Sequence, residues 1–222
     1  MFKVQKSIEA TQETSGGGSG YINNSGVYDV TINFASVEAS KNGAEQMNFN
    51  VSYNGNDTVL YGPYIQNNDG KANEIGQALI NKLAIIAGME DGDDFIEEEQ
   101  THTVGKDNAE KTFLVIDNFT DMPVKMHIKF EYSKYNGNIQ ERKNIVAFFD
   151  EDGASAQEIV KGEDHGKQLA IVLEKYADAV TYRDGLTEED IKEWIAAKSK
   201  GGTPAPKASS STAPRRKFGR SA

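Results

Sequence analysis

Apolar side chains that alternate with polar ones in several short runs place the strongest constraint on the fold of this chain. The pattern occurs in GVYDVTINFA, in EQMNFNVSY and in VKMHIKFEY. The alternating residues are Tyr28, Val30, Ile32 and Phe34 in the first run, Met47, Phe49, Val51 and Tyr53 in the second, and Val124, Met126, Ile128 and Phe130 in the third. A period of two puts such side chains on one face of a β-strand. Much of the core is therefore predicted to come from half-buried strands.

Turn signals separate these strands. Asn54-Gly55 and Asn136-Gly137 are typical of two-residue hairpin turns, and SKNG (40–43) reads as a turn between the first two strands. In a third strand, TVLYGPYI, Gly62-Pro63 must bend the chain or mark an edge of the sheet. Three further strands are predicted in KTFLVIDNF, VKMHIKFEY and NIQERKNIVAFF.

Helical spacing replaces the strand pattern at Ala72. In ANEIGQALINKLAIIAG the apolar residues Ile75, Leu79, Leu83 and Ile86 recur at helical intervals, and Gly88 is expected to cap the helix. The spacing of Ser155 and Glu158 is that of a capping box at the start of a short helix. GKQLAIVLEKYADAV and TEEDIKEWIAAK predict two more helices.

The element order of three strands, a helix and two strands is that of the OB-fold, a five-stranded Greek-key barrel. The fold class is therefore predicted to be mainly β with helices (α+β), an OB-like barrel with an extended last hairpin and appended C-terminal helices. Residues 1–154 would form the OB-like domain and residues 155–200 a C-terminal helical extension. Residues 201–222, rich in Gly, Pro, Ser and basic residues, are predicted to be a disordered basic tail.

Composition narrows the class of protein further. The chain has 222 residues and no cysteine, so it can form neither disulfides nor thiolate metal sites. No apolar run approaches the roughly 20 residues that cross a bilayer, and the N-terminus lacks the apolar centre of a secretory signal. We therefore expect a protein of the cytoplasm that does not contact a membrane. The formal net charge is −10, and Glu90–Glu99 holds seven carboxylates in ten residues, a block typical of a solvated loop.

The sequence contains no catalytic or cofactor signature, so no enzymatic activity, cofactor or metal is predicted. It has no phosphate-binding loop of the G-x-x-x-x-G-K-[ST] type, and its three histidines lie far apart. One enzymatic alternative remains, because Glu141-Arg142-Lys143 is an acid-x-lysine triplet of the kind found in some metal-dependent nucleases. A second acid, Asp117 or Asp121, would have to complete that metal site.

A basic and tyrosine-rich hairpin stands out from this acidic chain. Between Lys125 and Lys143 there are five Lys or Arg residues against two acids. Proteins that hold single strands without reading sequence combine cations for the phosphates with aromatic faces that stack on bases. The predicted nucleic-acid-binding residues are Lys41, Tyr53, Tyr61, Tyr64, Lys125, His127, Lys129, Tyr132, Lys134, Tyr135, Arg142 and Lys143. The structural alternative is an edge hairpin whose lysines prevent aggregation.

The segments GVYDVTINFASVEASKNGAEQMNFNV, LINKLAIIAG and FTDMPVKMHIKFEYSKYNGNIQERKNIVAFFD resemble a family of bacteriophage proteins encoded among replication and recombination genes. The resemblance covers about residues 1–200. It implies an OB-fold protein that coats single-stranded DNA in phage replication and recombination, and works beside a phage polymerase, recombinase or nuclease. A second function class remains open, a protein-interaction module such as a phage inhibitor of a host factor or a virion component.

Overall fold

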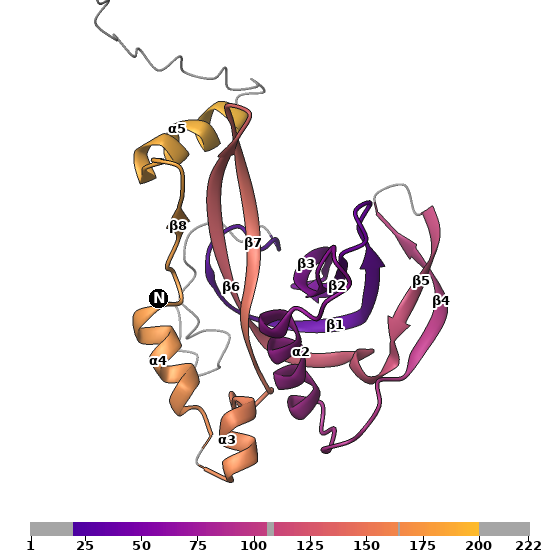
Figure 1. The fold of residues 1–222 in the computed structure, drawn as a ribbon. Coiled ribbons are helices and arrows are strands. Elements are labelled where there is room, and N and C mark those ends of the chain that lie inside the picture. Colours follow the sequence, from indigo (N-terminus) through magenta and orange to yellow (C-terminus); the bar gives the residue numbers. More distant parts are fainter. Residues whose placement is uncertain (1–19, 106–108, 164, 200–222) are drawn as a thin grey trace, which may run out of the picture. The chain divides into compact units, whose positions relative to one another are not determined.

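The computed structural model describes residues 20–105, 109–163 and 165–199 (Figure 1). The chain divides into two compact units. The first unit comprises Met1–Glu131 and Arg142–Thr181, and the second comprises Tyr132–Glu141 and Tyr182–Ala222, each as far as its residues are described. The predicted domain boundary at residue 154 stays a prediction. The predicted tail at 201–222 lies outside the described residues.

Three antiparallel strands open the first unit: β1 (Gly26–Ala39), β2 (Glu45–Tyr53) and β3 (Asn56–Gln66). The predicted turn between β2 and β3 is confirmed, since Asn54 and Gly55 both have positive φ (49° and 75°), as a tight hairpin requires. β1 bends at an irregularity between Ile32 and Phe34. That extra residue moves Phe34 to the face opposite Ile32, so the prediction that both share one face is wrong.

Helix α2 (Glu74–Ile86) follows β3 and packs against it. Its first turn is capped by the Asn73 side chain, which accepts a hydrogen bond from the Gly76 N–H. Gly88 adopts positive φ (82°) just past the helix, as predicted. The buried face consists of Gly76, Ile80, Leu83 and Ala84. The predicted face was partly wrong, because Ile75 is 86% exposed.

A hairpin of β4 (Glu97–Val104) and β5 (Ala109–Ile116) comes next, and a 3₁₀ turn at Asp117–Phe119 ends it. The predicted strand KTFLVIDNF corresponds to β5. β4 was not predicted, because its first residues belong to the acidic block that the sequence suggested was a loop. In β4, Glu97–Glu99 pair with Leu114–Ile116 of β5, while their side chains stay exposed. β5 pairs with the end of β1 through Ala35, Ser36 and Val37.

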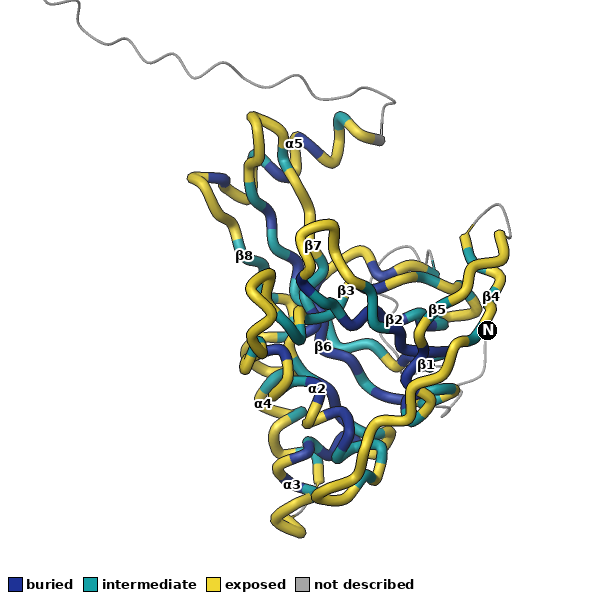
Figure 2. The backbone as a smooth tube through the Cα atoms, turned by 45° about the vertical axis from the view of Figure 1, so that its right-hand side comes forward, coloured by how far each residue is buried: buried dark blue, intermediate teal, exposed yellow. Residues whose placement is uncertain are grey.

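β6 (Met122–Tyr135) returns to pair antiparallel with the start of β1, and β7 (Asn138–Phe149) pairs with β6. The neighbours β6-β1-β2-β3 therefore have the strand order of a Greek key. Along β6 the predicted core residues are buried: Val124, Met126, Ile128 and Phe130. Figure 2 shows the buried backbone positions running along β1, β2 and β6. The fold is thus mostly β, an open antiparallel sheet with a few helices.

The remaining elements are α3 (Ala156–Lys161), α4 (Lys167–Lys175), the short β8 (Thr181–Tyr182) and α5 (Glu188–Ser199). The capping box predicted for Ser155 and Glu158 is confirmed, with both reciprocal hydrogen bonds present. α3 and α4 belong to the first unit, whereas α5 belongs to the second. Among the described residues, no helix is both long and apolar enough to cross a membrane.

Candidate nucleic-acid interface

An irregularity in β3 places two exposed tyrosines on one face of the sheet. Tyr61 pairs with Asn48 and Tyr64 with Gln46, so three steps along β3 match two steps along β2. Side chains three apart on a regular strand point to opposite faces. The additional residue at Gly62-Pro63 brings both tyrosines to the same face, where Tyr61 is 67% and Tyr64 45% exposed.

Amide side chains of β2 lie beside these tyrosines. By alternation Gln46, Asn48 and Asn50 share the tyrosines' face. Gln46 donates through Nε2 to the carbonyl of Gly62 at 2.9 Å, which ties β2 to the bulge. Asn50 Oδ1 accepts a hydrogen bond from Asn33 Nδ2 at 3.2 Å. Asn48 is buried, and its Oδ1 has no hydrogen-bond partner among the described residues.

The β4–β5 hairpin forms a wall along this face. Phe34 of β1 stacks on His102 of β4, with 3.9 Å between ring centroids and 12° between ring planes. Phe113 of β5 lies 5.1 Å from the Phe34 ring. Strands separated by a third strand are about 9–10 Å apart in a flat sheet, so the Phe34 and His102 rings meet over β5. We call this surface the Tyr61 face: Phe34, Gln46, Asn48, Asn50, Tyr61, Tyr64, His102 and Phe113.

The lysine and the histidine of the wall both have partners within the protein. Lys111 Nζ lies 3.3 Å from Glu38 Oε1 and 4.5 Å from the centroid of the Phe113 ring. His102 Nε2 is 3.0 Å from Gln100 Oε1. The face can therefore offer aromatic surface and amide hydrogen bonds, whereas its lysine is already engaged by a carboxylate.

Two of the predicted cationic residues are used within the first unit. Lys125 Nζ forms an ion pair of 2.5 Å with Asp29, its neighbour on β1. Lys143 Nζ donates to the Ile22 carbonyl at 2.7 Å and lies 5.4 Å from the Phe130 ring centroid. Both lysines stabilise the protein itself, and we leave them out of the proposed interface.

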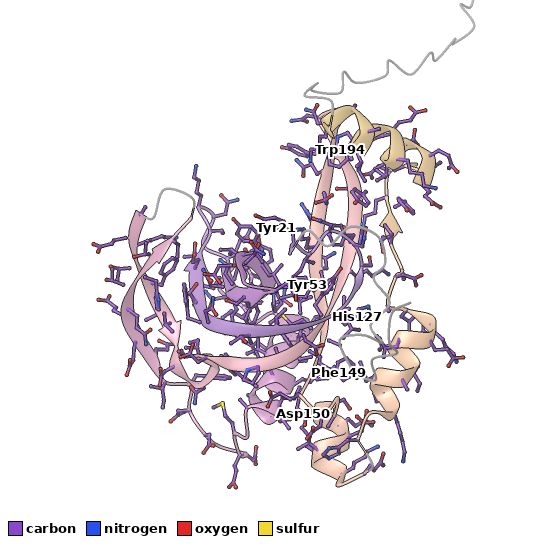
Figure 3. The ribbon with its side chains drawn as sticks, turned by 180° about the vertical axis from the view of Figure 1, so that it is seen from behind. Tyr21, Tyr53, His127, Phe149, Asp150 and Trp194 are labelled. Atoms are coloured by element: carbon purple, nitrogen blue, oxygen red, sulfur yellow. The ribbon has the colours of Figure 1, made fainter. Side chains whose placement is uncertain are left out.

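His127 lies in β6 (Figure 3), and its imidazole is buried. It is only 5% exposed, one ring nitrogen is hydrogen-bonded to the Tyr176 backbone, and Nε2 has no partner among the described residues. Burial lowers its pKa, the Tyr176 hydrogen bond opposes that shift, and nearby Lys129 adds to it. His127 is therefore a core residue, and the prediction that it contacts nucleic acid is wrong.

This buried histidine predicts a pH dependence of stability. The folded protein resists protonation of His127, whereas the unfolded chain binds that proton as the pH falls below about 6.5, the ordinary histidine pKa. The free energy of unfolding should therefore decrease between about pH 7 and pH 5. In His127→Phe the part of this slope due to His127 should vanish, as urea unfolding across that range would reveal. An unchanged slope in the variant would refute the assignment, and His102→Phe provides the control.

Tyr132 is also buried, within the second unit. Its ring stacks with Tyr182 (6.1 Å, 13°) and meets Trp194 edge-on (6.1 Å, 75°), and its hydroxyl donates to Glu141 at 3.1 Å. Burial, followed by the Glu141 charge, raises the Tyr132 pKa. Tyr132 thus anchors α5 to the hairpin, and its ring cannot stack on a base.

The other predicted residues are accessible to different degrees. Lys41, Lys134, Tyr135 and Arg142 are exposed and Lys129 is half-buried. Lys134 and Tyr135 belong to the second unit, while Lys41, Lys129 and Arg142 belong to the first. Tyr53 lies on the opposite side of β2 from the Tyr61 face, with its ring edge-on to Tyr28 at 5.2 Å. Of the predicted aromatic residues in the first unit, Tyr61 and Tyr64 alone share an exposed face.

The nuclease alternative rests on Glu141, which accepts the Tyr132 hydrogen bond. Within the part of the chain that the structure describes, no three His, Asp or Glu side chains gather closely enough to hold a metal ion.

Sequence reasoning predicted only Tyr61 and Tyr64 of the Tyr61 face and missed its other members, which are the β2 amides, Phe34, His102 and Phe113. The alternation of Gln100 and His102 with Thr101 and Thr103 was a signal for a strand. The preceding run of carboxylates concealed it. Comparison with known proteins finds no matching family model and no matching curated protein.

Proposed function

We propose that this protein binds single-stranded DNA without enzymatic activity and with little sequence preference, and that the Tyr61 face holds the strand. The observation that supports this proposal most directly is the bulge at Gly62-Pro63, which puts Tyr61 and Tyr64 side by side on an exposed face. Successive bases can stack on such a pair, at about 1–3 kcal/mol per base. The adjacent amides can hydrogen-bond base edges as donors and acceptors.

The strand order supports an OB-type barrel as the scaffold. The neighbours β3-β2-β1-β6-β7 fit a five-stranded Greek-key arrangement, to which the β4–β5 hairpin is an addition on the end of β1. OB-folds bind oligonucleotides with the face of their second and third strands and the adjoining loops. Tyr61, Tyr64 and the amides lie on β3 and β2, and Lys41 lies in the β1–β2 turn. The resemblance to phage proteins supports a role in phage replication and recombination, beside a polymerase, recombinase or nuclease.

Titration with a fluorescent oligothymidylate at several salt concentrations tests this function. Because Lys125 and Lys143 are engaged within the protein and Lys134 belongs to the second unit, we expect only about three cations, Lys41, Lys129 and Arg142, to reach phosphates. The slope of log K against log salt should then be about −2, from a factor of about −0.7 per phosphate contact on single strands. Duplex of equal length should bind more weakly, since stacking requires unpaired bases. Affinity no better than millimolar at low salt would end the proposal.

Charge reversal separates the phosphate contacts from the stacking contacts. Lys129→Glu combined with Arg142→Glu should weaken binding and flatten the salt slope, with the circular dichroism spectrum unchanged. The matched control is Lys71→Glu, an exposed lysine that already pairs with Asp69 at 3.1 Å. Equal losses in the control and the double variant would show only a general charge effect.

A further inference from the structure

Helix α2 carries a second apolar stripe on the side that its core face does not use. The stripe consists of Ile75, Ala78 and Leu79, and Lys82 continues it by one turn. These residues recur at intervals of three and four, so they share one side of the helix. Ile75 and Ala78 are exposed, and Leu79 is half-buried. A surface helix usually carries polar residues away from its core face. A second apolar stripe therefore indicates a surface that binds something.

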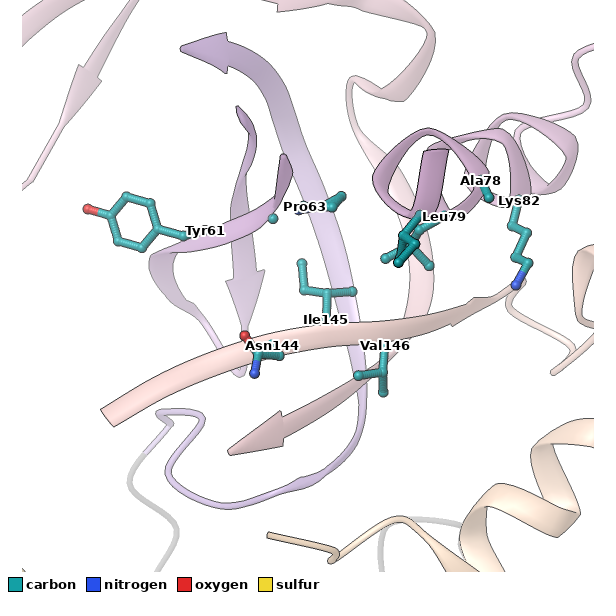
Figure 4. Close-up of a pocket in the computed structure, with 10 residues that line it drawn as sticks. Tyr61, Pro63, Ala78, Leu79, Lys82, Asn144, Ile145 and Val146 are labelled. Carbon is teal, nitrogen blue, oxygen red and sulfur yellow. The ribbon is translucent and has the colours of Figure 1, made fainter. Parts of the chain in front are cut away.

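This stripe forms one wall of a groove of about 540 Å³ in the first unit. β3 contributes Tyr61, Gly62 and Pro63, and β7 contributes Asn144, Ile145 and Val146. Figure 4 shows the Ile145 side chain directed from β7 toward the side of Pro63 and Leu79, with Lys82 at one end of the groove and the Tyr61 side chain directed away from α2. Among its ten described lining residues, Lys82 is the one charged side chain, although the whole chain is strongly acidic.

The same unit displays a segment with the complementary chemistry. Phe95 and Ile96 lie between Asp94 and Glu97, and Ile96 is 52% exposed. The segment is held in place: the Ile96 N–H donates to Asn118 Oδ1 at 2.8 Å, and its carbonyl accepts from the Asp117 N–H at 2.9 Å. The Phe95 ring packs on Phe119 at 5.8 Å. A pre-ordered segment loses little entropy on binding.

We propose that the groove receives the Phe95-Ile96 segment of a second copy of this chain. The apolar pair would cover Ile75, Leu79 and Val146, and the flanking carboxylates would face Lys82. Charge complementarity selects this occupant, because the groove combines apolar walls with a cation and the segment combines apolar side chains with anions. The two surfaces are different parts of the chain, so the contact is head-to-tail and leaves one groove and one segment open for further copies.

Sedimentation velocity of the full chain over a rising concentration series tests this contact. The apparent mass of the unmodified protein should rise with concentration above the 24.3 kDa of one chain. Ile75→Glu in the groove and Ile96→Glu in the segment should each raise the apparent dissociation constant at least about tenfold, since a buried carboxylate without a partner opposes association. Both changes lie at exposed positions, and circular dichroism checks the fold. Val160→Glu, on an exposed position of α3, controls for the added charge.

A mixture of the two variants gives the decisive test. Ile75→Glu retains an intact Phe95-Ile96 segment and Ile96→Glu retains an intact groove, so the mixture should form a one-to-one dimer that does not grow further. Lys82→Glu should weaken self-association, and adding Glu97→Lys to the same chain should restore it.

A parent that stays monomeric to about millimolar concentration overturns the proposal, as does association that persists in either single variant. Association lost in Ile75→Glu but kept in Ile96→Glu would assign the groove to another partner segment and equally refute this one. None of these outcomes depends on nucleic-acid binding, so the contact and the proposed function stand or fall separately.

Discussion

Replacing Tyr61 or Tyr64 with alanine should each lower the affinity for oligothymidylate by about 5- to 150-fold, the equivalent of about 1–3 kcal/mol per lost base stack. The salt slope should stay unchanged, because neither phenol neutralises a phosphate. Tyr→Phe at either position should retain most of the affinity, since the ring face supplies the stacking. Fluorescence titration at two salt concentrations measures both quantities.

Tyr53→Ala is the matched control for these variants. Tyr53 lies on the neighbouring strand but on the other side of the sheet, where its ring packs against Tyr28. Its loss should reduce stability without a comparable effect on affinity. If Tyr53→Ala weakens binding as much as Tyr61→Ala while the fold persists, the strand lies on a different surface from the Tyr61 face.

Gly76→Ala should destabilise the protein strongly, although alanine favours helices. A Cβ on Gly76 would lie 1.8 Å from the Tyr64 carbonyl oxygen, which belongs to the backbone of β3. α2 and β3 would have to separate, and overpacking of this kind costs about 1–3 kcal/mol or more. The gain in helix propensity, about 1 kcal/mol, offsets only part of this. We expect a net loss of about 2 kcal/mol in urea unfolding.

Ala78→Gly provides the comparison on the same helix. Ala78 is exposed, so this change should cost only the helix propensity, about 1 kcal/mol. Gly76→Ala should also reduce oligothymidylate affinity, because Tyr64 moves with the displaced segment of β3. A Gly76→Ala protein as stable as the parent would mean that α2 does not approach β3 as closely as the structure indicates.

The short-range elements of this fold could be predicted because local chemistry determines them. Alternation predicted β1, β2 and β6, and the Asn-Gly pairs predicted two hairpin turns whose positive φ values few other residues tolerate. The spacing of Ser155 and Glu158 predicted a helix start from two side chains that reach neighbouring backbone groups. β4 was not predicted because its carboxylates are typical of a solvated loop. The segment is a strand because it pairs with β5.

The candidate site required the tertiary structure, because exposure and the choice of face depend on residues distant in sequence. Tyr53, Tyr61, Tyr64 and Tyr132 look equivalent in sequence as aromatic residues of strands. Tyr182 and Trp194, which lie 50 and 62 residues further along the chain, bury Tyr132. The β2–β3 register turns Tyr61 and Tyr64 to one side and Tyr53 to the other.

Sequence alone thus determined that the chain is rich in strands, where several of them turn, and that tyrosines lie in β2 and β3. It also named Gly62-Pro63 as a bend or an edge. Only the tertiary structure decided that the bend is a bulge that aligns two tyrosines. A one-residue shift reverses every later side chain on a strand, and the pairing partner alone reveals that shift. Only the tertiary structure, likewise, revealed that Lys125 and Lys143 are engaged within the protein. Their partners, Asp29 and Ile22, lie about a hundred residues earlier in the sequence.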